Sequence, residues 1–552
     1  MSARSRNCVP TLPFSEGTKL IVTCAATQLN DMDATLASLI AQMHSIAKVL
    51  PEYDVVMSTY GVGYVLGPQL IAEIGDISRF KKKQSLAAYA DVDPEQKQSG
   101  KNDPTRTYKN FSTIKPFYTC RWHLTNMIIS AKIISFIKLA DKESLMYISR
   151  HAERTVAKLS KMFGAILVAG PRQVGKTTML DQITNGLNRA TLDDPIMRAA
   201  AEEQSGTFFL DNPPPVFVDE IQKAPALFEQ IKLYLDKDKK KGQFYLCGSQ
   251  QFRMMKGVSE SLAGRIGLVT LLGFSMRERQ GLAFDLPFIP TEEYFAARKA
   301  EKAEIGYFDA WNMIHRGSMP ELADNPDYDW RLFYSSYVNT YIERDVKELS
   351  EIGDTVKFTN FMVATAACIG QLLNLTSLAR DVGISVPTAE RWLSILVASN
   401  IVYLLQPYSN NILKRVVKTP KLYFLDTGLA AYLTKWTTPE VLKNGAMAGA
   451  FFENFIISEI IKSYYNKGIT EPPLYFYRDK DMNEIDLMIE DGGTLYPVEI
   501  KKHADPHKKD ISAFQKLDNI PGMKRGTGGV VCLYDKLISL SETDKVIPIN
   551  YL

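Results

Sequence analysis

The sequence predicts a multidomain α/β protein, and three observations support this fold class. An apolar run at residues 165–169 leads into a glycine-containing loop, and a segment that reads as a helix follows that loop. Two further apolar runs, at residues 215–218 and 243–247, each end in polar residues, as the strands of a parallel sheet flanked by helices do. The length of 552 residues corresponds, at roughly 150 residues per domain, to about three or four domains.

The composition is that of an ordinary globular protein. Hydrophobic residues make up 45% and charged residues 23% of the chain, so several cores can be buried. The formal net charge is only +3, and any contact with nucleic acid must therefore come from local patches. The six cysteines form no CxxC pair, so we expect a reducing cytoplasm and neither a zinc site nor a disulfide framework. No signal peptide is recognisable, and the most apolar span, residues 127–137, is too short for a membrane and contains Lys132.

The N-terminal region, residues 1–102, combines two helical features. Apolar residues recur at helical spacing over residues 30–50 and predict one amphipathic helix. Downstream, Gly61 and Gly63 form a GxG turn that opens a helical segment, an arrangement that resembles a helix-hairpin-helix. Such an element offers backbone N–H groups to a DNA phosphate without reading bases. We therefore expect a small all-α segment with weak DNA binding here.

The order of short motifs over residues 45–102 resembles the C-terminal part of a family of insertion-sequence transposases. In that family a RuvC-like DEDD catalytic domain precedes a helix-hairpin-helix region. The resemblance places Ser99 in the Gln-Ser-Gly signature, where a serine nucleophile is expected, whereas Asp91 stands where the family usually has glycine. No DEDD domain is found upstream, so the resemblance implies a transposase fragment. A polar, turn-rich linker over residues 103–145 would join it to a new unit that starts at Met146.

A glycine loop that ends in lysine and threonine follows the apolar run at residues 165–169. Strand, glycine loop, Lys-Thr and helix, in that order, form the phosphate-binding loop of P-loop NTPases. The glycines allow backbone N–H groups to turn inward around a polyphosphate. We expect Lys176 to reach the β- and γ-phosphates of ATP, Thr177 to ligate Mg²⁺, and the helix N-terminus to add its partial positive charge. The predicted nucleotide-binding residues are Gly170, Pro171, Arg172, Gln173, Val174, Gly175, Lys176, Thr177 and Thr178.

Two later strands are expected to complete this site. The apolar run before Asp219 and Glu220 reads as a Walker B strand, in which Asp219 holds Mg²⁺ through water and Glu220 polarises the attacking water. At the end of the third strand, Ser249 and Gln250 are sensor candidates beside the γ-phosphate, with a strand-end turn as the alternative for either residue. Arg265 is a candidate arginine finger, in cis or toward a neighbouring subunit, with a surface arginine as the alternative.

The short sequence motifs of this stretch also resemble those of a known family. GPRQVGKTT, LDDP, FVDEIQ, GSQQF and SLAGR follow one another in this order. They resemble a family of prokaryotic AAA-like ATPases, in which a C-terminal domain of uncharacterised function has endonuclease-like features. The resemblance covers residues 146–552 and implies an AAA-like ATPase domain over residues 146–330, built on a parallel sheet flanked by helices.

Residues 331–440 are expected to be helical and to contain a winged helix. Two helical segments meet at Gly383, with Ser385 as the cap of the second, which is the pattern of a helix-turn-helix. In a DNA reader the second helix enters the major groove, and Thr388 and Arg391 are the candidate contacts. Packing as a structural module is the alternative, since Arg391 is the only basic residue on that helix. The candidate wing strands are residues 402–405 and 421–424.

The C-terminal region, residues 441–552, carries acids in a pattern that resembles the PD-(D/E)XK nucleases, whose fold is a restriction-endonuclease-like α/β domain. Glu453 lies on a predicted helix, and Asp486 lies on a predicted strand. Glu499 and Lys501 point to the same face of the next strand, because they are two residues apart. Asp486 and Glu499 would hold one Mg²⁺, with Glu453 completing the ligand set. Lys501 would orient or deprotonate the attacking water. The alternative is a degenerate fold that keeps these acids as a surface hairpin.

Together these features predict an ATP-binding protein whose AAA-like domain hydrolyses ATP with Mg²⁺. Coupling to DNA binding, or to DNA cleavage by the C-terminal domain, extends this prediction. The alternative is a non-cleaving, nucleotide-dependent switch that binds a protein or DNA partner. An oligomer is compatible with either function. We expect no membrane partner, and no transposition by this chain alone.

Overall fold

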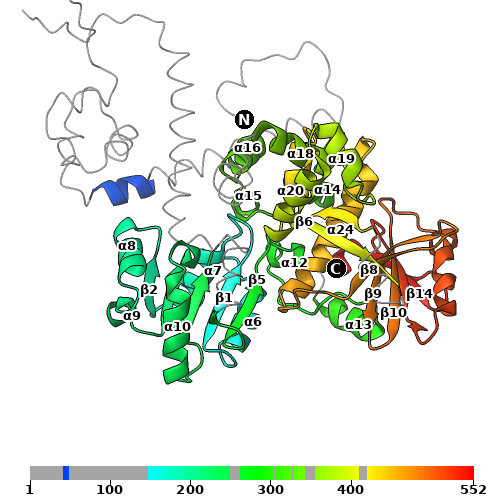
Figure 1. Ribbon diagram of the computed structural model, residues 1–552. Coiled ribbons are helices and arrows are strands. Elements are labelled where there is room, and N and C mark those ends of the chain that lie inside the picture. The colour runs from blue at the N-terminus through cyan, green and yellow to red at the C-terminus, as the bar shows by residue number, and fades with distance from the viewer. Residues whose placement is uncertain are drawn as a thin grey trace, which may run out of the picture. The chain divides into compact units, whose positions relative to one another are not determined.

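The chain divides into two compact units, residues 1–125 and 126–552. In the first unit, residues 41–47 are helical, within the stretch predicted as an amphipathic helix. The predicted helix-hairpin-helix, Ser99 and the linker at residues 103–145 lie outside the described residues. The computed structural model describes residues 41–48, 147–248, 261–301, 306–325, 327–341, 355–409 and 419–552 (Figure 1).

A five-stranded parallel sheet, in the order β2-β3-β4-β1-β5, forms the first part of the large unit. The side chains of β1 alternate between two cores. Ile166 and Val168 pack into the core on one face, and Ala165 and Leu167 pack into the core on the other. Both faces are therefore covered, as a parallel sheet requires. The strands are β1 (Ala165–Ala169), β2 (Asn188–Thr191), β3 (Val216–Asp219), β4 (Phe244–Cys247) and β5 (Ile266–Thr270).

Helices supply both of these cores. α6 (Ala152–Leu159) and α7 (Lys176–Ile183) pack on the face that holds Ile166. The helices that pack on the other face are α8 (Pro195–Glu203), α9 (Phe208–Asp211) and α10 (Ala226–Lys237) (Figure 1). The arrangement of strands and helices confirms the predicted parallel-sheet core, including the strand, loop and helix around residues 165–183.

A group of helices follows the parallel sheet in the chain. α19 ends at Gly383, whose φ of +72° lies in the left-handed region that favours glycine. Ser385 then caps α20 by accepting a hydrogen bond from the N–H of Thr388 at 3.2 Å. The two helices predicted to meet at Gly383 are therefore present. The helices of this group are α12 (Met276–Arg279), α13 (Glu292–Ala300), α14 (Tyr307–Arg316), α15 (Pro320–Asp324), α16 (Trp330–Tyr341), α18 (Thr355–Ala367), α19 (Leu375–Val382), α20 (Val386–Ala398), α22 (Thr427–Leu433) and α23 (Pro439–Asn444).

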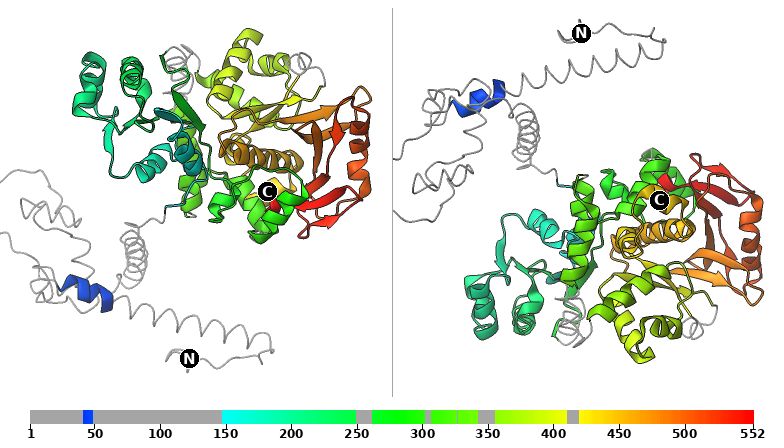
Figure 2. Two further views of the ribbon diagram at one scale, coloured as in Figure 1. Left: turned by 90° about the horizontal axis from the view of Figure 1, so that it is seen from below. Right: turned by 90° about the horizontal axis from the view of Figure 1, so that it is seen from above.

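The C-terminal part is built on a mixed sheet, in the order β13-β14-β12-β10-β9-β8-β6-β7, with β11 beside β10. β8, β9 and β10 pair antiparallel, whereas β10, β12 and β14 pair parallel. Helix α24 (Ala448–Tyr465) packs on one face, and the 3-10 helix η6 (Lys508–Asn519) supplies the core on the other (Figure 2). The strands are β6 (Val402–Pro407), β7 (Lys421–Phe424), β8 (Leu474–Arg478), β9 (Glu484–Asp491), β10 (Thr494–Ile500), β11 (Lys524–Arg525), β12 (Gly528–Cys532), β13 (Ile538–Ser539) and β14 (Asp544–Pro548).

The two strands predicted as wings belong to this C-terminal sheet. β6 and β7 pair antiparallel, so the predicted hairpin exists. β6 also pairs parallel with β8, with Gln406 opposite Tyr475. The pair is therefore not confined to a wing, because β6 uses its other edge to continue the C-terminal sheet. The sheet consequently spans the domain boundary expected between residues 440 and 441.

A buried carboxylate holds several of the middle helices together. Asp426 accepts hydrogen bonds from the N–H and the hydroxyl of Ser318, at 2.7 and 2.8 Å. It also accepts one from the hydroxyl of Tyr334 in α16, at 2.7 Å. As the N-cap of α22, Asp426 accepts a further bond from the N–H of Leu429 at 2.7 Å. Because these donors come from separate elements, the side chain of Asp426 fixes their mutual positions.

Asp426→Ala should lower the free energy of unfolding by about 2–4 kcal/mol, since it leaves buried donors without an acceptor and removes a helix cap. A thermal-unfolding scan of the full chain would record this as a lower Tm. Asp194→Ala is the matched control, because Asp194 is an exposed N-cap that accepts from the N–H of Ile196 at 2.8 Å. It should cost about 1 kcal/mol. Equal shifts of Tm in the two variants would contradict the role assigned to Asp426.

Candidate functional site

The glycine loop joins the end of β1 to the start of α7, and two glycines shape it. Gly170 has a φ of +146°, and a Cβ atom there would lie 2.0 Å from the carbonyl oxygen of Leu271. Gly175 has a φ of +83° and is the N-cap of α7. Side chains are excluded from the first position by contact and disfavoured at both by the backbone conformation. The loop can therefore turn closely in front of a helix N-terminus, where N–H groups bind phosphate.

Lys176 is the first residue of α7, and its side chain reaches back over the loop. Its ammonium group donates to the carbonyl oxygens of Gly170 and Pro171, at 3.0 and 2.6 Å. The residue is buried. The ammonium group therefore lies against the backbone of the glycine loop itself.

Side chains from two elements, α7 and β4, contact the carboxylate of Asp219, the last residue of β3. The hydroxyl of Thr177 in α7 donates to Asp219 Oδ1 at 3.2 Å. The thiol of Cys247, the last residue of β4, donates to the same oxygen at 2.7 Å. Burial, and then the negative charge of Asp219, raise the pKa of the Cys247 thiol well above its usual value, so it remains a donor at neutral pH. The two predicted Mg²⁺ ligands of the ATPase core, Thr177 and Asp219, are thus brought together.

Two neighbours of Asp219 were not predicted from the sequence. Cys247 is one, although its position at the end of the third apolar run could have indicated that it lies at this edge of the sheet. The other is Arg189 in β2, whose guanidinium lies 3.7 Å from Asp219 Oδ2 and 2.6 Å from Asp181 Oδ1. Arg189 reaches this place because it lies opposite Phe217 in the parallel pairing of β2 with β3. That register is a tertiary property, and no local pattern marks the residue.

Glu220 directly follows Asp219 at the same edge of the sheet. Its backbone is left-handed, with a φ of +55°, which costs roughly 1 kcal/mol or more in a residue other than glycine. The side-chain amide of Gln222 donates to Glu220 Oε2. The backbone turn and this contact restrict the orientation of the Glu220 carboxylate directly after the last residue of β3.

Arg265 lies at the wrong edge of the sheet for an arginine finger in cis. It precedes β5, and its carbonyl oxygen accepts the N–H of Ala165 at the start of β1, whereas the glycine loop follows the other end of β1. Its guanidinium pairs with Asp236 at 2.8 Å. The role in cis is therefore wrong, because parallel pairing places the starts of both strands together. A contribution to a neighbouring subunit stays a prediction, and Ser249 and Gln250 lie outside the described residues.

A second cluster of charges lies on β9 and β10 of the C-terminal sheet. Val498 pairs with Leu487 in the antiparallel register, which sets Glu499 opposite Asp486. Lys501 Nζ donates to Asp486 Oδ2 at 3.3 Å and to Glu499 Oε2 at 2.6 Å. The structure thus brings together the two predicted strand acids and the predicted lysine around one nitrogen atom.

The electrostatics of this cluster limit what Lys501 can do. Burial, and then the charge of Asp486, raise the pKa of Glu499 to about 9, although the charge of Lys501 acts in the opposite direction. Although burial alone lowers the pKa of Lys501, the two carboxylates raise it above its usual value. Lys501 therefore stays an ammonium group, which can orient a water molecule but is a poor base for deprotonating one.

Glu453, on α24, is held by the strand that precedes it in the chain. It accepts hydrogen bonds from the hydroxyl of Tyr423 at 2.6 Å and from Lys421 Nζ at 3.3 Å. Lys421 is buried and also pairs with Glu484 at 2.6 Å. Burial, and then the charge of Asp486, raise the pKa of Glu453 to about 7. Glu453 is thus electrostatically coupled to the strand acids, while its direct partners are on β7.

The predicted metal site with three carboxylates is not formed. Among the described residues, no three side chains of His, Cys, Asp or Glu are grouped to hold one metal ion. The prediction that Glu453 is a third metal ligand beside Asp486 and Glu499 is therefore wrong. Lys421 and Tyr423 bind the Glu453 carboxylate instead. Those two residues were missed because the sequence placed them in a wing strand.

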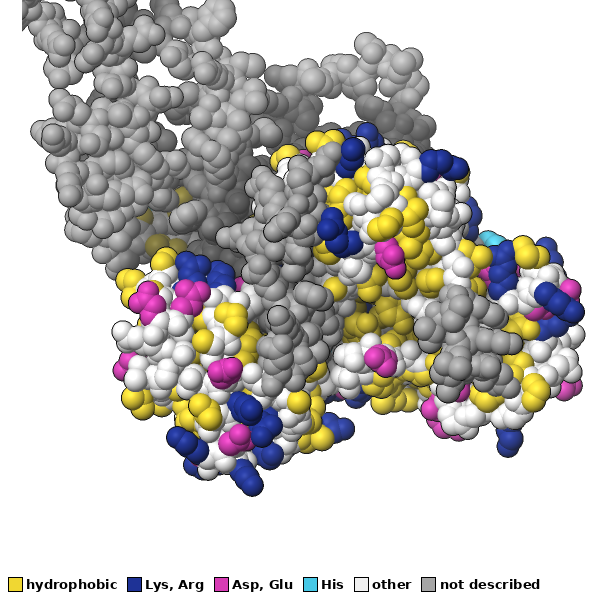
Figure 3. All heavy atoms as spheres, viewed as in Figure 1, with side chains coloured by type: hydrophobic (Ala, Val, Ile, Leu, Met, Phe, Trp, Pro, Cys, Tyr) yellow, Lys and Arg dark blue, Asp and Glu magenta, His cyan; other side chains and the backbone are white. Residues whose placement is uncertain are grey.

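The exposed face of the second helix of the helix-turn-helix is not strongly basic. Thr388, a predicted DNA contact, shares a hydrogen bond of 2.8 Å with the hydroxyl of Ser385 at the start of α20. Arg391 is exposed, and so is its neighbour Glu390. On the face shown in Figure 3, Lys and Arg side chains are interspersed with Asp, Glu and apolar ones. DNA reading by α20 stays a prediction.

Four segments of the chain match known protein families. Residues 163–280 match the family described as AAA domain, and residues 53–115 match the Transposase IS116/IS110/IS902 family. Residues 308–440 match Domain of unknown function (DUF8612), and residues 448–552 match Domain of unknown function (DUF4143). The predicted P-loop ATPase domain and the transposase fragment are thereby confirmed. Among the described helices, none is long and apolar enough to cross a membrane.

Curated relatives match two different parts of the chain. An uncharacterized protein of Mycobacterium tuberculosis (strain ATCC 25618 / H37Rv) is 27% identical over 353 residues, which cover 62% of this chain and 71% of the relative. An uncharacterized protein of Mycobacterium bovis matches with the same values. The transposase for insertion sequence element IS1111A of Coxiella burnetii is 28% identical over 85 residues, or 15% of this chain and 23% of that protein.

Solved structures show only a distant likeness. The Walker-type ATPase paby2304 of Pyrococcus abyssi is 15% identical, with a TM-score of 0.33, and the match covers 51% of this chain and 94% of that one. The RuvB Holliday junction branch migration motor of Thermotoga maritima is 15% identical, with a TM-score of 0.23, over 46% of this chain and 88% of that one.

Lys421→Met should lower the free energy of unfolding by about 3–5 kcal/mol, because Glu453 and Glu484 lose a buried cation. Arg478→Met is the matched control, since Arg478 approaches the same Glu484 at 3.7 Å from a more exposed position, and it should cost less than about 1 kcal/mol.

The double variant Lys421→Met/Glu453→Gln should recover part of that loss, because the carboxylate left without its cation is removed as well. Urea unfolding of the full chain would measure the free energy of unfolding of the parent, Lys421→Met, Glu453→Gln and the double variant. Simple additivity of the two single changes would show that Lys421 and Glu453 do not depend on each other.

Proposed function

We propose that this protein binds ATP with Mg²⁺ and hydrolyses it at the loop between β1 and α7. The observation that carries the proposal is the convergence of Lys176, Thr177 and Asp219 at one edge of a parallel sheet. Backbone N–H groups of the loop and the N-terminus of α7 would bind the phosphates, and Lys176 would neutralise charge on the β- and γ-phosphates. The match of residues 163–280 to an AAA domain supports the same function.

The donor set at this edge suits Mg²⁺. The Thr177 hydroxyl and the Asp219 carboxylate are hard oxygen donors, their oxygens lie 3.2 Å apart, and Mg²⁺ takes such ligands together with water and phosphate oxygens. Thr177 would hold the ion directly and Asp219 through water. When bound, the ion neutralises charge that develops on the phosphates. The Cys247 thiol holds the second ligand in place through the hydrogen bond to Asp219 Oδ1.

Glu220 is the group that would polarise the attacking water. Its carboxylate follows the Walker B acid directly, and the amide of Gln222 contacts one of its oxygens. Phosphoryl transfer depends on positioning more than on covalent chemistry, so a carboxylate that is held in place by its backbone and a neighbour serves the reaction well.

Lys176→Ala in the full chain should reduce ATP turnover by about 100-fold or more, because transition-state charge loses a preorganised cation. Glu220→Gln should reduce turnover by about 100-fold while ATP still binds, since a positioned base contributes to the chemical step. Phosphate release measures ATP turnover, and a fluorescent ATP analogue measures nucleotide binding.

Arg265→Ala serves as the control in this series. Its turnover should match the parent at low protein concentration, whereas a loss confined to high concentration would reveal a role toward a neighbouring subunit. Parental turnover in Lys176→Ala would contradict the proposed ATPase site. Tight ATP binding with little turnover in the parent would favour the alternative, a non-cleaving switch that captures a protein or DNA partner.

A second candidate function is Mg²⁺-dependent cleavage of DNA phosphodiesters by the C-terminal domain. The observation that favours it is the placement of Asp486 and Glu499 within hydrogen-bonding distance of the same Lys501 nitrogen. Two carboxylates completed by water are a usual ligand set for Mg²⁺, so these residues fit the ion without Glu453. Lys501 would orient the attacking water, and the bound ion would stabilise charge on the phosphate.

Supercoiled plasmid nicking by the full chain in Mg²⁺ or Mn²⁺ tests this function. The parent should nick the plasmid, and Asp486→Ala and Lys501→Ala should each lose the activity, because each removes part of the metal and water site. Lys502→Ala is the matched control, since Lys502 is exposed and follows the cluster directly. A parent that nicks no DNA with either ion would contradict the nuclease proposal.

We further propose a cytoplasmic location for this protein. The cysteines that the structure describes, Cys247, Cys368 and Cys532, are free thiols, which fits a reducing compartment.

A further inference from the structure

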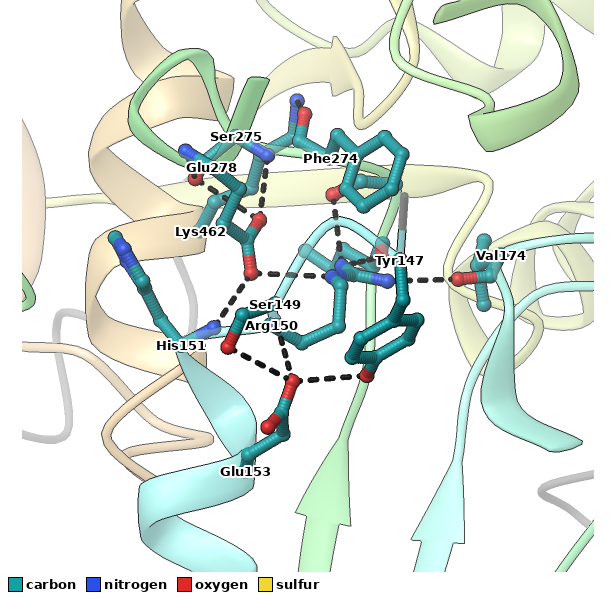
Figure 4. Close-up of polar contacts among 12 residues, drawn as sticks. Tyr147, Ser149, Arg150, His151, Glu153, Val174, Phe274, Ser275, Glu278 and Lys462 are labelled. Carbon is teal, nitrogen blue, oxygen red and sulfur yellow. Dashed lines mark hydrogen bonds and ion pairs between the residues drawn. The ribbon is translucent and has the colours of Figure 1, made fainter. Parts of the chain in front are cut away.

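Arg150, which lies just before α6, holds the main chain of the glycine loop (Figure 4). Its Nη1 donates to the carbonyl oxygen of Val174 at 2.8 Å, one residue before the Gly175 cap. Its Nη2 donates to the carbonyl oxygen of Leu272, downstream of β5, also at 2.8 Å. The guanidinium carbon lies 4.7 Å from the centre of the Phe274 ring. A planar guanidinium can bind several acceptors in fixed directions, so Arg150 joins the loop to the segment after β5.

The counter-ion of Arg150 is the completely buried carboxylate of Glu278 in α12. Glu278 Oε1 accepts from Arg150 Nε at 3.1 Å and from the N–H of His151 at 2.9 Å. Glu278 Oε2 accepts from the N–H and the hydroxyl of Ser275, at 2.8 and 2.9 Å. Burial by itself raises the pKa of Glu278, but Arg150 and these donors lower it below its usual value. Arg150 and Glu278 therefore form a buried ion pair with several further hydrogen bonds.

The segment that contains Glu278 is bound on its other side by helix α24. The N–H of Met276 donates to Glu459 Oε2 at 2.6 Å. Lys462 Nζ donates to the carbonyl oxygen of Phe274 at 3.1 Å and to Glu459 Oε1 at 2.8 Å. Glu459 and Lys462 are buried. In Figure 4, Arg150 lies between Val174 and the Glu278 carboxylate, and Lys462 lies on the far side of the Phe274–Ser275 segment.

Helix α24 also reaches the charged cluster of the C-terminal sheet. Glu453 precedes Glu459 by six residues on α24, which is about 9 Å along the helix axis. One rigid element thus carries both the contacts to the α12 segment and the carboxylate that Lys421 and Tyr423 bind.

We propose that Arg150 is a positioning residue for the ATP site, and that the buried contacts from Arg150 through Glu278 and Glu459 couple this site to α24. None of these charged groups can separate from its partner without leaving an unpaired buried charge, so a shift at one end must be followed at the other. Coupling between sites is reciprocal in free energy, so the state of the C-terminal domain should alter ATP affinity and the reverse. The kinetic consequence rests on the proposed ATP function, whereas the coupling of the loop to α24 does not.

Arg150→Lys tests the positioning role in the full chain. Lysine keeps a cation for Glu278 but lacks the fork that reaches Val174 and Leu272. The KM for ATP should rise about tenfold, the effect of losing the one charged hydrogen bond that reaches the loop at Val174, while kcat changes little because Lys176 and Glu220 remain. A merely structural role would lower the Tm and leave KM unchanged, and that result would overturn the positioning role.

Glu459→Gln tests the coupling from a distance, since Glu459 does not contact the loop. We expect a smaller rise of KM in the same direction. Hydrogen–deuterium exchange of peptides over residues 165–183 should become faster, because the loop loses part of its support. Arg154→Met is the matched control, as Arg154 is exposed, lies in α6 beside Arg150 and pairs with Asp285 at 3.0 Å. The KM for ATP and the exchange rate of the loop peptides should keep their parental values in this control.

The exchange measurement separates the two proposals. Faster loop exchange in Glu459→Gln supports the coupling even if the parent neither binds nor hydrolyses ATP, a result that would reject only the proposed ATPase. Parental loop exchange in a folded Glu459→Gln variant overturns the coupling, whatever the parent does with ATP. If Glu459→Gln does not fold, Lys462→Gln provides the same two outcomes, since Lys462 contacts the carbonyl oxygen of Phe274 directly.

Discussion

The burial of helix α24 is the constraint on which the large unit depends. The helix is buried along almost its whole length, so its polar side chains need partners inside the protein. Asn454 bonds both the N–H and the carbonyl oxygen of Phe424, at 2.7 and 2.6 Å, and thereby joins the helix to β7. Glu459 and Lys462 join it to the segment that supports the glycine loop, and Glu453 joins it to the C-terminal cluster. One helix therefore determines how the nucleotide-binding part and the C-terminal sheet fit together within this unit.

The charged groups of the two candidate sites have different partners. At the glycine loop, Lys176 donates to backbone carbonyl oxygens, and the Asp219 carboxylate is approached by a hydroxyl, a thiol and, at 3.7 Å, the guanidinium of Arg189. In the C-terminal cluster, Lys501 and Lys421 bind the acids directly, and burial raises the pKa of Glu499 to about 9. The ATPase proposal is the stronger of the two, because residues 163–280 match an AAA domain, whereas residues 448–552 match a domain of unknown function.

Local and non-local features of these sites were predictable to different degrees. The glycine loop is contiguous, so its shape and the placement of Lys176 and Thr177 at the start of α7 follow from residue order. Asp486, Glu499 and Lys501 meet because a short hairpin joins their strands, which is also a local property. Arg265 was misplaced because the strand that follows it, β5, was not predicted from the sequence, and the parallel pairing of β5 with β1 sets Arg265 at the edge opposite the glycine loop. Arg150 was missed because its partners lie far away in the chain and no repeated spacing marks it.

The sequence by itself determined the class of the fold, the parallel sheet with its glycine loop and Walker B strand, and the two helices that meet at Gly383. These features follow from hydrophobic period and turn chemistry, which act over a few residues. Only the tertiary structure decided that β6 and β7 extend the C-terminal sheet, that Lys421 and Tyr423 bind Glu453, and that Arg150 connects the loop to α24. Each of these depends on how a distant segment satisfies a buried polar group or an unpaired strand edge, and such a partner is chosen by packing in three dimensions.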